Sequence, residues 1–440
     1  MLAAAGASVG LGNIWRFPYL AAKYGGGIFL IIYIVLALTF GYTMIVAETA
    51  IGRMTRKSPV GAFKSFGKKK WLSFGGWINA VIPVLIVPYY SVIGGWVIKY
   101  LVEYFRGNAK LLAEDGYFTD FISNGVSTEL CFVAFCAFTL IIIFAGVQNG
   151  IERVSKIMMP ILIVLSVIIA VYSVTRPGAL AGVKYFLVPN VKNFSWMTVV
   201  SAMGQMFYSL SIAMGILITF GSYMKKDTAI EDSTRNVEVF DTGIAIMAGL
   251  MIIPAVFAFS GGDPDTLQAG PSLMFITIPK VFQNMGFGTV IGIVFFLLVL
   301  FAAVTSSIAL TESAVSTFED ELGWGRKKAT VLVGVIMLVL GSLSSLGYGP
   351  LAGIKIIGMQ FLDLFDFLTN SVMMLIAALL TSLLVSRVVG IDKIEEEIIH
   401  GESAFRRKKV FVVMIKYLCP VFAIIILLSS VANALGWIKM

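Results

Sequence analysis

The residues of this sequence best suited to chemistry are residues 5–18 (AGASVGLGNIWRFP), which interrupt an otherwise apolar segment. They include three glycines and Asn13, and each glycine weakens a helix by about 1 kcal/mol relative to alanine. At membrane depth, such a break is tolerated only where the freed backbone groups face protein or a water-filled cavity. Free carbonyls and half-helix ends at mid-membrane can hold an ion beside a small polar solute. We therefore predict a binding site here.

Residues suited to covalent or metal chemistry are scarce. The single histidine, His400, falls in a charged loop, and Cys131, Cys136 and Cys419 fall in apolar segments. This pattern argues against a disulfide framework or a thiolate metal site. It also lacks the usual residues for nucleophilic or metal catalysis, and no hydrolase triad can be assembled. We therefore predict that the protein is not an enzyme.

Composition indicates a membrane protein. Hydrophobic residues make up 58% of the 440 residues and charged residues only 13%, against about 25% charged in soluble domains. The formal net charge of +8 raises the question of nucleic acid. The cations fall in loops on one side of the apolar segments, however, so they are a topology signal. We expect membrane lipid around the protein and no nucleic-acid partner.

Eleven apolar segments predict an all-α polytopic membrane protein, with a single transporter domain over residues 1–440. The segments run approximately over residues 1–22, 27–52, 73–104, 127–146, 151–175, 194–224, 238–261, 286–318, 328–346, 358–386 and 411–437. Residues 53–70 contain seven lysines and arginines and no acidic residue. Because cytoplasmic loops carry the excess of cations, we predict a cytoplasmic N-terminus, an outside C-terminus and a place in the plasma membrane.

The sixth apolar segment corresponds weakly to the first. Residues 207–215 (FYSLSIAMG) bring serines and a glycine into a hydrophobic helix. The two segments lie five spans apart, which would give the halves opposite orientations, and paired interrupted helices are typical of inverted-repeat transporters. We predict inverted repeats over about 1–175 and 194–387, with an additional helix at 411–437. The alternative for the sixth segment is ordinary packing of small residues between membrane helices.

The sequence resembles the neurotransmitter:sodium symporter family, in particular its bacterial eleven-span amino-acid transporters. The resemblance covers nearly the whole chain and rests on residues 10–18 (GLGNIWRFP), 25–27 (GGG), 48–53 (ETAIGR), 89–90 (YY), 204–211 (GQMFYSLS), 305–307 (TSS) and 318–321 (FEDE). Gly150 and Pro160, separated by nine residues, are similar to a motif that lets the fifth helix unwind on the cytoplasmic side. The resemblance implies a 5+5 inverted-repeat fold with unwound first and sixth helices.

The resemblance also implies two sodium sites. Sodium is a hard cation that prefers oxygen ligands, and every implied ligand offers oxygen. One site would use the Ser8 carbonyl with the side chains of Asn13, Ser209 and Asp241. The other would use the carbonyls of Gly6, Val9 and Ala302 with the hydroxyls of Thr305 and Ser306. The alternative for these two hydroxyls is a hydrogen bond to their own helix backbone.

Asp241 departs from the family, which commonly has asparagine here. A lone carboxylate in a membrane span costs a few kcal/mol unless it is paired or neutralised. With Tyr33, Gln205 and Ser209 around it, Asp241 would supply the negative charge that chloride supplies in other members. We therefore expect transport that is independent of chloride. The alternative is an acid near the loop at the cytoplasmic end of the seventh span.

Gly10 bears on the substrate class. The family's monoamine carriers have an aspartate at this position, whereas a glycine leaves room for an α-amino acid carboxylate near the half-helix N-termini. Tyr90 would donate a hydrogen bond to that carboxylate. The implied substrate-contacting residues are Ser8, Leu11, Gly12, Ile86, Tyr90, Tyr208, Ser211, Met214, Ser306 and Leu310. Their mostly apolar side chains favour a neutral hydrophobic or aromatic amino acid; the alternative is simple helix packing.

The resemblance implies two gates. Arg16 and Asp366 match an extracellular ion pair that commonly closes through water, with Tyr208 beneath it; alternatively, Arg16 is an interfacial snorkelling residue. Tyr223 and Asp320 match residues of the inner gate.

The partners of these inner-gate residues in the family precede the first span, and the sequence begins inside that span. We interpret this as a missing upstream segment; the alternative is a weak inner gate. Glu48 and Glu312 are expected to be structural partners at a helix end or in the bundle interior.

Together these features predict a symporter that couples sodium entry to amino-acid uptake by alternating access. The alternative is a sodium-gated sensor that binds the same ligand without turnover.

Overall fold

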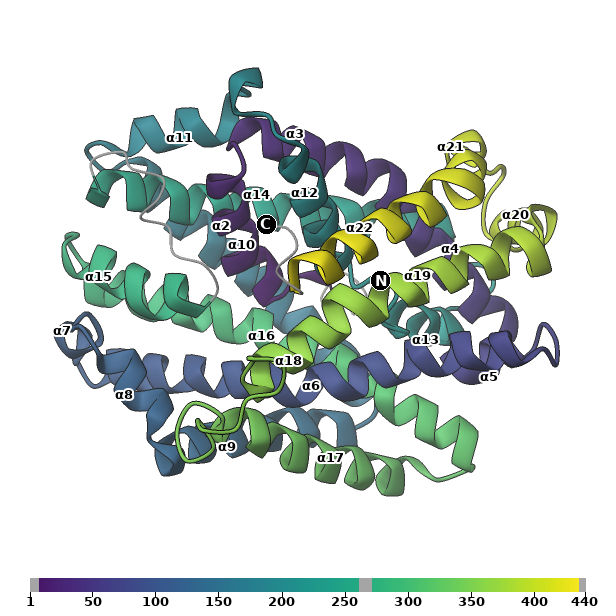
Figure 1. Ribbon diagram of the computed structural model, residues 1–440, viewed down its shortest axis with the longest axis horizontal. Helices are drawn as coiled ribbons and strands as arrows, with labels where there is room; N and C mark the ends of the chain where they lie inside the picture. Colours follow the sequence, from purple (N-terminus) through teal and green to yellow (C-terminus); the bar gives the residue numbers. More distant parts are fainter. Residues whose placement is uncertain (1–7, 261–270, 435–440) are drawn as a thin grey trace.

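The structure is a computed structural model that describes residues 8–260 and 271–434, and the described chain is helical (Figure 1). The spans are, in order, η1 (Gly12–Arg16) with α2 (Phe17–Lys23); α3 (Gly27–Leu36), η2 (Ala37–Gly41) and α4 (Tyr42–Thr55); α6 (Lys70–Phe105); α9 (Gly125–Phe144); η3 (Val147–Glu152) and α10 (Arg153–Val174); α12 (Trp196–Ser209) and α13 (Ile216–Tyr223); α14 (Ile230–Ser260); α16 (Gly288–Leu322); α17 (Arg326–Leu346); α18 (Phe361–Asp366), η7 (Phe367–Met373), α19 (Met374–Leu384) and η8 (Val385–Val389); and α21 (Lys408–Val413), η9 (Met414–Leu418) and α22 (Cys419–Ala434).

Shorter helices lie in the connecting segments. They are α5 (Pro59–Lys64), α7 (Ala109–Leu112), α8 (Tyr117–Ser123), α11 (Ala179–Leu187), η4 (Val191–Asn193), η6 (Leu273–Thr277), α15 (Ile278–Gln283) and α20 (Ile391–Ile399).

Nine helices of the described chain are long and apolar enough to cross a membrane, and the first and sixth spans are not among them. Both of these spans are interrupted. In the first, Val9 and Gly10 leave the helix and a π-helical turn follows. In the sixth, α12 ends at Ser209, and Ser211 and Ala213 have φ angles of 55° and 59°. Such angles are uncommon for residues other than glycine, so this break is a defined feature of the backbone. The unwound first and sixth helices and the count of about eleven spans are thus confirmed.

Helix lengths repeat after five spans. The second to fifth spans contain 29, 36, 20 and 28 residues, and the seventh to tenth contain 31, 35, 21 and 29. Because five is odd, matching helices cross the membrane in opposite directions. The longest pair, α6 and α16, pack against each other, and both line the pocket around the break in the first helix.

The seventh span begins eight residues earlier than its apolar segment, at Ile230 instead of residue 238. Its charged first turns are paired with the segment before the eleventh span: Glu231 accepts hydrogen bonds from the backbone N–H groups of Arg406 and Arg407, and Arg407 also pairs with Glu238. The low hydropathy of these turns is the reason that the start of the helix was not predicted, and the partners compensate the charges there. Asp241 is therefore three turns inside α14, and its alternative placement beside a loop is wrong.

The basic connecting segments gather at one end of the bundle. Figure 1 shows α5, α20 and α21 together at that end, and α7, α8, α11 and α15 at the other. The lysine-rich run before α6 and the arginine pair before α21 belong to the first group.

Candidate functional site

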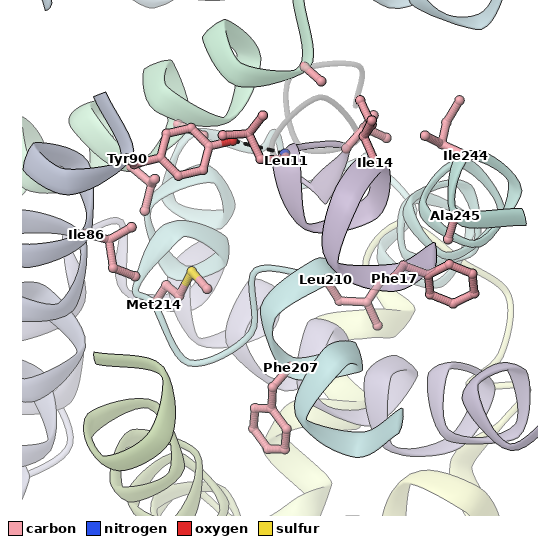
Figure 2. Close-up of a cluster of buried hydrophobic side chains, with 14 of the residues drawn as sticks. Leu11, Ile14, Phe17, Ile86, Tyr90, Phe207, Leu210, Met214, Ile244 and Ala245 are labelled. Carbon is pink, nitrogen blue, oxygen red and sulfur yellow. Dashed lines mark hydrogen bonds between the residues drawn. The ribbon is translucent and has the colours of Figure 1, made fainter. Parts of the chain in front are cut away.

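A buried pocket surrounds the break in the first helix. Its lining comes from the broken first and sixth spans and from α6 and α16. The lining residues are Ser8, Gly10, Leu11, Gly12, Asn13, Ile86, Tyr90, Tyr208, Ser209, Ser211, Met214, Ile216, Ser306 and Leu310. All ten residues predicted to contact substrate are among them, and Ile216 is an addition. Figure 2 shows Tyr90 beside Leu11, with Ile86 and Met214 near each other below Tyr90.

The backbone of the break is in direct contact with its surroundings. The Leu11 N–H donates to the Tyr90 hydroxyl at 3.2 Å, drawn as a dashed line in Figure 2. A Cβ atom at Gly10 would lie 2.4 Å from Ser306 Oγ, and one at Gly12 would lie 2.5 Å from the Tyr208 ring. Glycine is therefore required at both positions for this close packing.

A first group of oxygens meets between the first, sixth and seventh spans. Asn13 Nδ2 donates to Ser209 Oγ and to Asp241 Oδ1, both at 2.8 Å, and Ser209 donates to Asp241 at 2.7 Å. The other carboxylate oxygen of Asp241 accepts from the Tyr33 hydroxyl at 2.7 Å. All four side chains are buried. None of the ion pairs among the described residues includes Asp241, so its charge has no protein cation.

Gln205, which was expected around Asp241, bonds to the backbone of the first helix. Its Nε2 donates instead to the Gly12 carbonyl at 2.9 Å. The carboxylate of Asp241 thus has three side-chain donors, and the glutamine stabilises the opened backbone.

A second group of oxygens joins the first helix to α16. Thr305 Oγ1 lies 3.4 Å from the Val9 carbonyl and 3.1 Å from the Ala302 carbonyl, and Ser306 Oγ lies 3.2 Å from Val9. Thr305 also contacts the Phe301 carbonyl of its own helix at 3.0 Å. The Thr305 hydroxyl therefore makes both of the contacts that were considered as alternatives: the bond to its own helix backbone and the contact with the first helix. The predicted ligand Gly6 lies outside the described residues.

The predicted outer pair does not form a direct contact. Arg16 lies over the Tyr208 ring, 5.2 Å from its centroid, whereas Asp366 accepts hydrogen bonds from Tyr89 at 3.3 Å and Asn370 at 2.5 Å. The ion pairs of the described chain do not include Arg16 with Asp366. Arg16 and Tyr208 instead line a cavity of about 230 Å³ next to the pocket.

Each of the two predicted inner-gate residues has a hydrogen-bond partner on another element. Tyr223 donates to Glu312 at 2.8 Å, and Asp320 accepts from the Ser58 N–H at 2.5 Å. Glu312 is fully buried and pairs with Arg326 at 2.6 Å. Through Tyr223 and Arg326, the Glu312 carboxylate joins α13, α16 and α17.

Glu48 has the interior structural role predicted for it. Its carboxylate accepts the Ala213 N–H at 2.8 Å, inside the break of the sixth span. The positive φ of Ala213 points this N–H away from a helical partner, and the carboxylate supplies one.

Comparisons with known proteins extend over the whole of this architecture. The family model described as the sodium:neurotransmitter symporter family matches residues 1–111 and 102–437. The chain is 34% identical over 435 residues to the uncharacterized sodium-dependent transporter YhdH of Bacillus subtilis (strain 168), covering 98% of this chain and 96% of that protein. It is 26% identical over 463 residues to the human sodium- and chloride-dependent GABA transporter 2, covering 90% and 73%.

A solved structure has the same fold. The crystal structure of MhsT in complex with L-phenylalanine matches with a TM-score of 0.87 and 34% identity, covering 98% of this chain and 97% of that chain. This chain therefore belongs to the sodium:neurotransmitter symporter family, and it is a multi-pass membrane transporter rather than an enzyme.

Proposed function

We propose that the protein is a sodium-coupled symporter that takes up a neutral hydrophobic or aromatic amino acid by alternating access. The observation that carries the proposal is the single pocket in which the opened first helix, the broken sixth helix and two groups of oxygens meet. The gathering of basic segments at one end supports a place in the plasma membrane with the N-terminus on the cytoplasmic side. The repeating helix lengths support two inverted repeats, over about 1–175 and 194–387.

The two groups of oxygens are suited to two sodium ions. In the first, Asn13 places its amide N–H₂ against the oxygens of Ser209 and Asp241, where a cation would also be stabilised. The amide oxygen accepts from the Gly10 N–H at 3.0 Å, so the amide would have to turn and give up that bond to present its oxygen to a cation. In the second, carbonyls and hydroxyls of the first helix and α16 face one another. Hard oxygen donors of this kind favour sodium over softer metals.

The carboxylate of Asp241 supports transport without chloride. It is buried, it lacks a protein cation among the described residues, and it lies beside the first oxygen group. The human relative is named for dependence on both sodium and chloride. Here the fixed carboxylate would carry the compensating negative charge, and replacing chloride with gluconate should leave uptake unchanged.

The substrate would bind with its carboxylate beside Tyr90 and Gly10 and its side chain against Ile86, Met214 and Leu310. This wall carries no charge, and methionine adapts to differently shaped ligands. The phenylalanine bound in the related crystal structure has the same class of side chain. The cavity measures only about 30 Å³ here, so the pocket must widen to admit such a substrate.

The gates follow from the same arrangement. Tyr208 covers the pocket, and Arg16 and Asp366 would close the outer side through water. On the inner side, Tyr223 and Asp320 would hold the inner gate until sodium and substrate have bound.

Counterflow in proteoliposomes tests the proposal. Preloaded unlabelled amino acid should drive entry of labelled phenylalanine or leucine only when sodium is present. A Tyr90→Phe variant should lose this exchange, whereas Tyr104→Phe should keep it. The Tyr104 hydroxyl lies on the same helix, buried and without a hydrogen-bond partner in the part of the chain that the structure describes. Sodium-dependent binding without exchange would instead favour the sensor, and no binding of any amino acid would refute both.

A further inference from the structure

A groove on the lipid-facing edge of the bundle contains a carboxylate that the transport site does not use. The helices α9 and α17 lie side by side at this edge (Figure 1). A cavity of about 540 Å³ opens between them, within the range of about 300–1,000 Å³ typical of ligand pockets. Its lining is apolar except at one end. The lining residues are Asn124, Gly125, Val126, Glu129, Leu130, Val133, Leu346 and Pro350.

Glu129 lies at the polar end of this groove. One carboxylate oxygen accepts a hydrogen bond from Ser342 on α17. The other has no hydrogen-bond partner among the described residues and is covered by protein atoms, while the side chain as a whole is partly exposed and lines the groove. The ion pairs of the described chain do not include Glu129. A carboxylate at a helix surface facing lipid costs a few kcal/mol unless a partner compensates its charge, and the protein supplies only a hydroxyl.

The groove has a polar end and an apolar wall, an arrangement that matches an amphipathic molecule. Glu129 lies one turn, about 6 Å, inside the start of α9, near the boundary between headgroups and acyl chains. Val126 and Leu130 are 73% and 67% exposed, so the apolar wall is open to the bilayer. With the N-terminus inside, this end of α9 faces the outer leaflet.

We propose that the groove binds an outer-leaflet phospholipid whose headgroup carries a primary ammonium. The ammonium would donate to the Glu129 carboxylate, and an acyl chain would lie along Leu130, Val133 and Leu346. The Asn124 side chain caps the Ser127 N–H, so the N–H groups before Ser127 would face the lipid phosphate. A choline headgroup has no N–H to donate, and a glycerol headgroup has no cation, so both should bind more weakly.

Native mass spectrometry of the purified full-length protein tests this proposal. The protein is titrated with phosphatidylethanolamine, phosphatidylcholine or phosphatidylglycerol. We expect wild-type protein to bind phosphatidylethanolamine about tenfold more tightly than phosphatidylcholine, in line with one hydrogen bond between charged groups. Glu129→Gln should reduce this preference to less than twofold. Glu396→Gln, an exposed change of the same chemistry on α20, should leave it unchanged.

A second variant separates lipid binding from a structural role. Ser342→Ala removes the bond between the two helices but keeps the carboxylate, so the lipid preference should remain. Equal loss in Glu129→Gln and Ser342→Ala would mean that the carboxyl group only joins α9 to α17. An unchanged preference in Glu129→Gln, or a lipid-independent dimer that covers the groove, would also overturn the proposal.

Discussion

Replacing Asp241 with asparagine removes a fixed negative charge. The protein should then depend on a mobile anion, chloride, to supply that charge. The change preserves shape: the remaining oxygen can still accept from Asn13 and Ser209, and the new N–H₂ can donate to the Tyr33 hydroxyl, which now accepts. The loss is therefore mainly one of charge. At about 4 Å and an effective dielectric constant of about 20, a unit charge pair is worth roughly 4 kcal/mol. Since 1.4 kcal/mol is a factor of ten, apparent sodium affinity should fall by up to about 1,000-fold.

The assay is a sodium titration of thermal stability at a fixed amino-acid concentration, in chloride and in gluconate. Wild-type protein should respond equally in both anions. Asp241→Asn should need far more sodium in gluconate, and chloride should recover part of the loss because it can enter beside Tyr33 and Ser209. Asp232→Asn is the matched control, since that carboxylate lies on the same helix in an exposed pair with Arg406. An unchanged sodium response in Asp241→Asn would refute the electrostatic reasoning.

Three further changes probe the pocket and its inner side. Gly12→Ala would place a methyl group 2.5 Å from the Tyr208 ring, so we expect amino-acid binding to be lost, as measured by equilibrium binding. Thr305→Val removes a hydroxyl from the second oxygen group and should weaken sodium activation of binding by about tenfold. Arg326→Gln leaves the buried Glu312 carboxylate without its cation, and breaking such a pair costs about 3–5 kcal/mol, which should appear as a lower melting temperature.

Each of these changes has a control in the same chain. Gly243→Ala meets open space and should bind normally. Thr311→Val removes a hydroxyl on the same helix that bonds to the Ser307 carbonyl of its own backbone, so sodium activation should persist. Lys156→Gln breaks an exposed ion pair and should change the melting temperature little. Equal effects in a variant and its control would contradict the assigned role.

The span boundaries were predictable because hydropathy reports directly on burial in lipid. Most apolar segments agree with the helices to within a few residues, and the exception is instructive. The first turns of α14 carry Glu231 and Glu238, whose compensation comes from Arg407, far away in the sequence. Hydropathy scores each residue alone and cannot register such a partner. For the same reason, the charge of Arg326 could be taken from the sequence, but its ion pair with Glu312 could not.

The pocket itself was predictable for a different reason. Gly10 and Gly12 are informative because they have no side chain. This can be recognised from the sequence without knowing which residues pack against them. What the sequence left out is which groups fill the space. Gln205 was expected beside Asp241, yet the opened Gly12 carbonyl needed a donor and the amide supplies it. A polar backbone group buried without a partner is costly, so the break recruits side chains that a motif assigns elsewhere.

This recruitment offers a physical route from ion binding to helix movement. Across the break, the Val9 carbonyl contacts α16, the Leu11 N–H contacts α6 and the Gly12 carbonyl contacts α12. The first two partners belong to the long helices that pack against each other, and the third belongs to the broken sixth span. A cation between Val9 and α16 would strengthen only the contact nearest the inner half of the first helix. Loss of that contact would free the inner half while Leu11 and Gly12 stay bound, so the break can act as a hinge for the inner half of the helix.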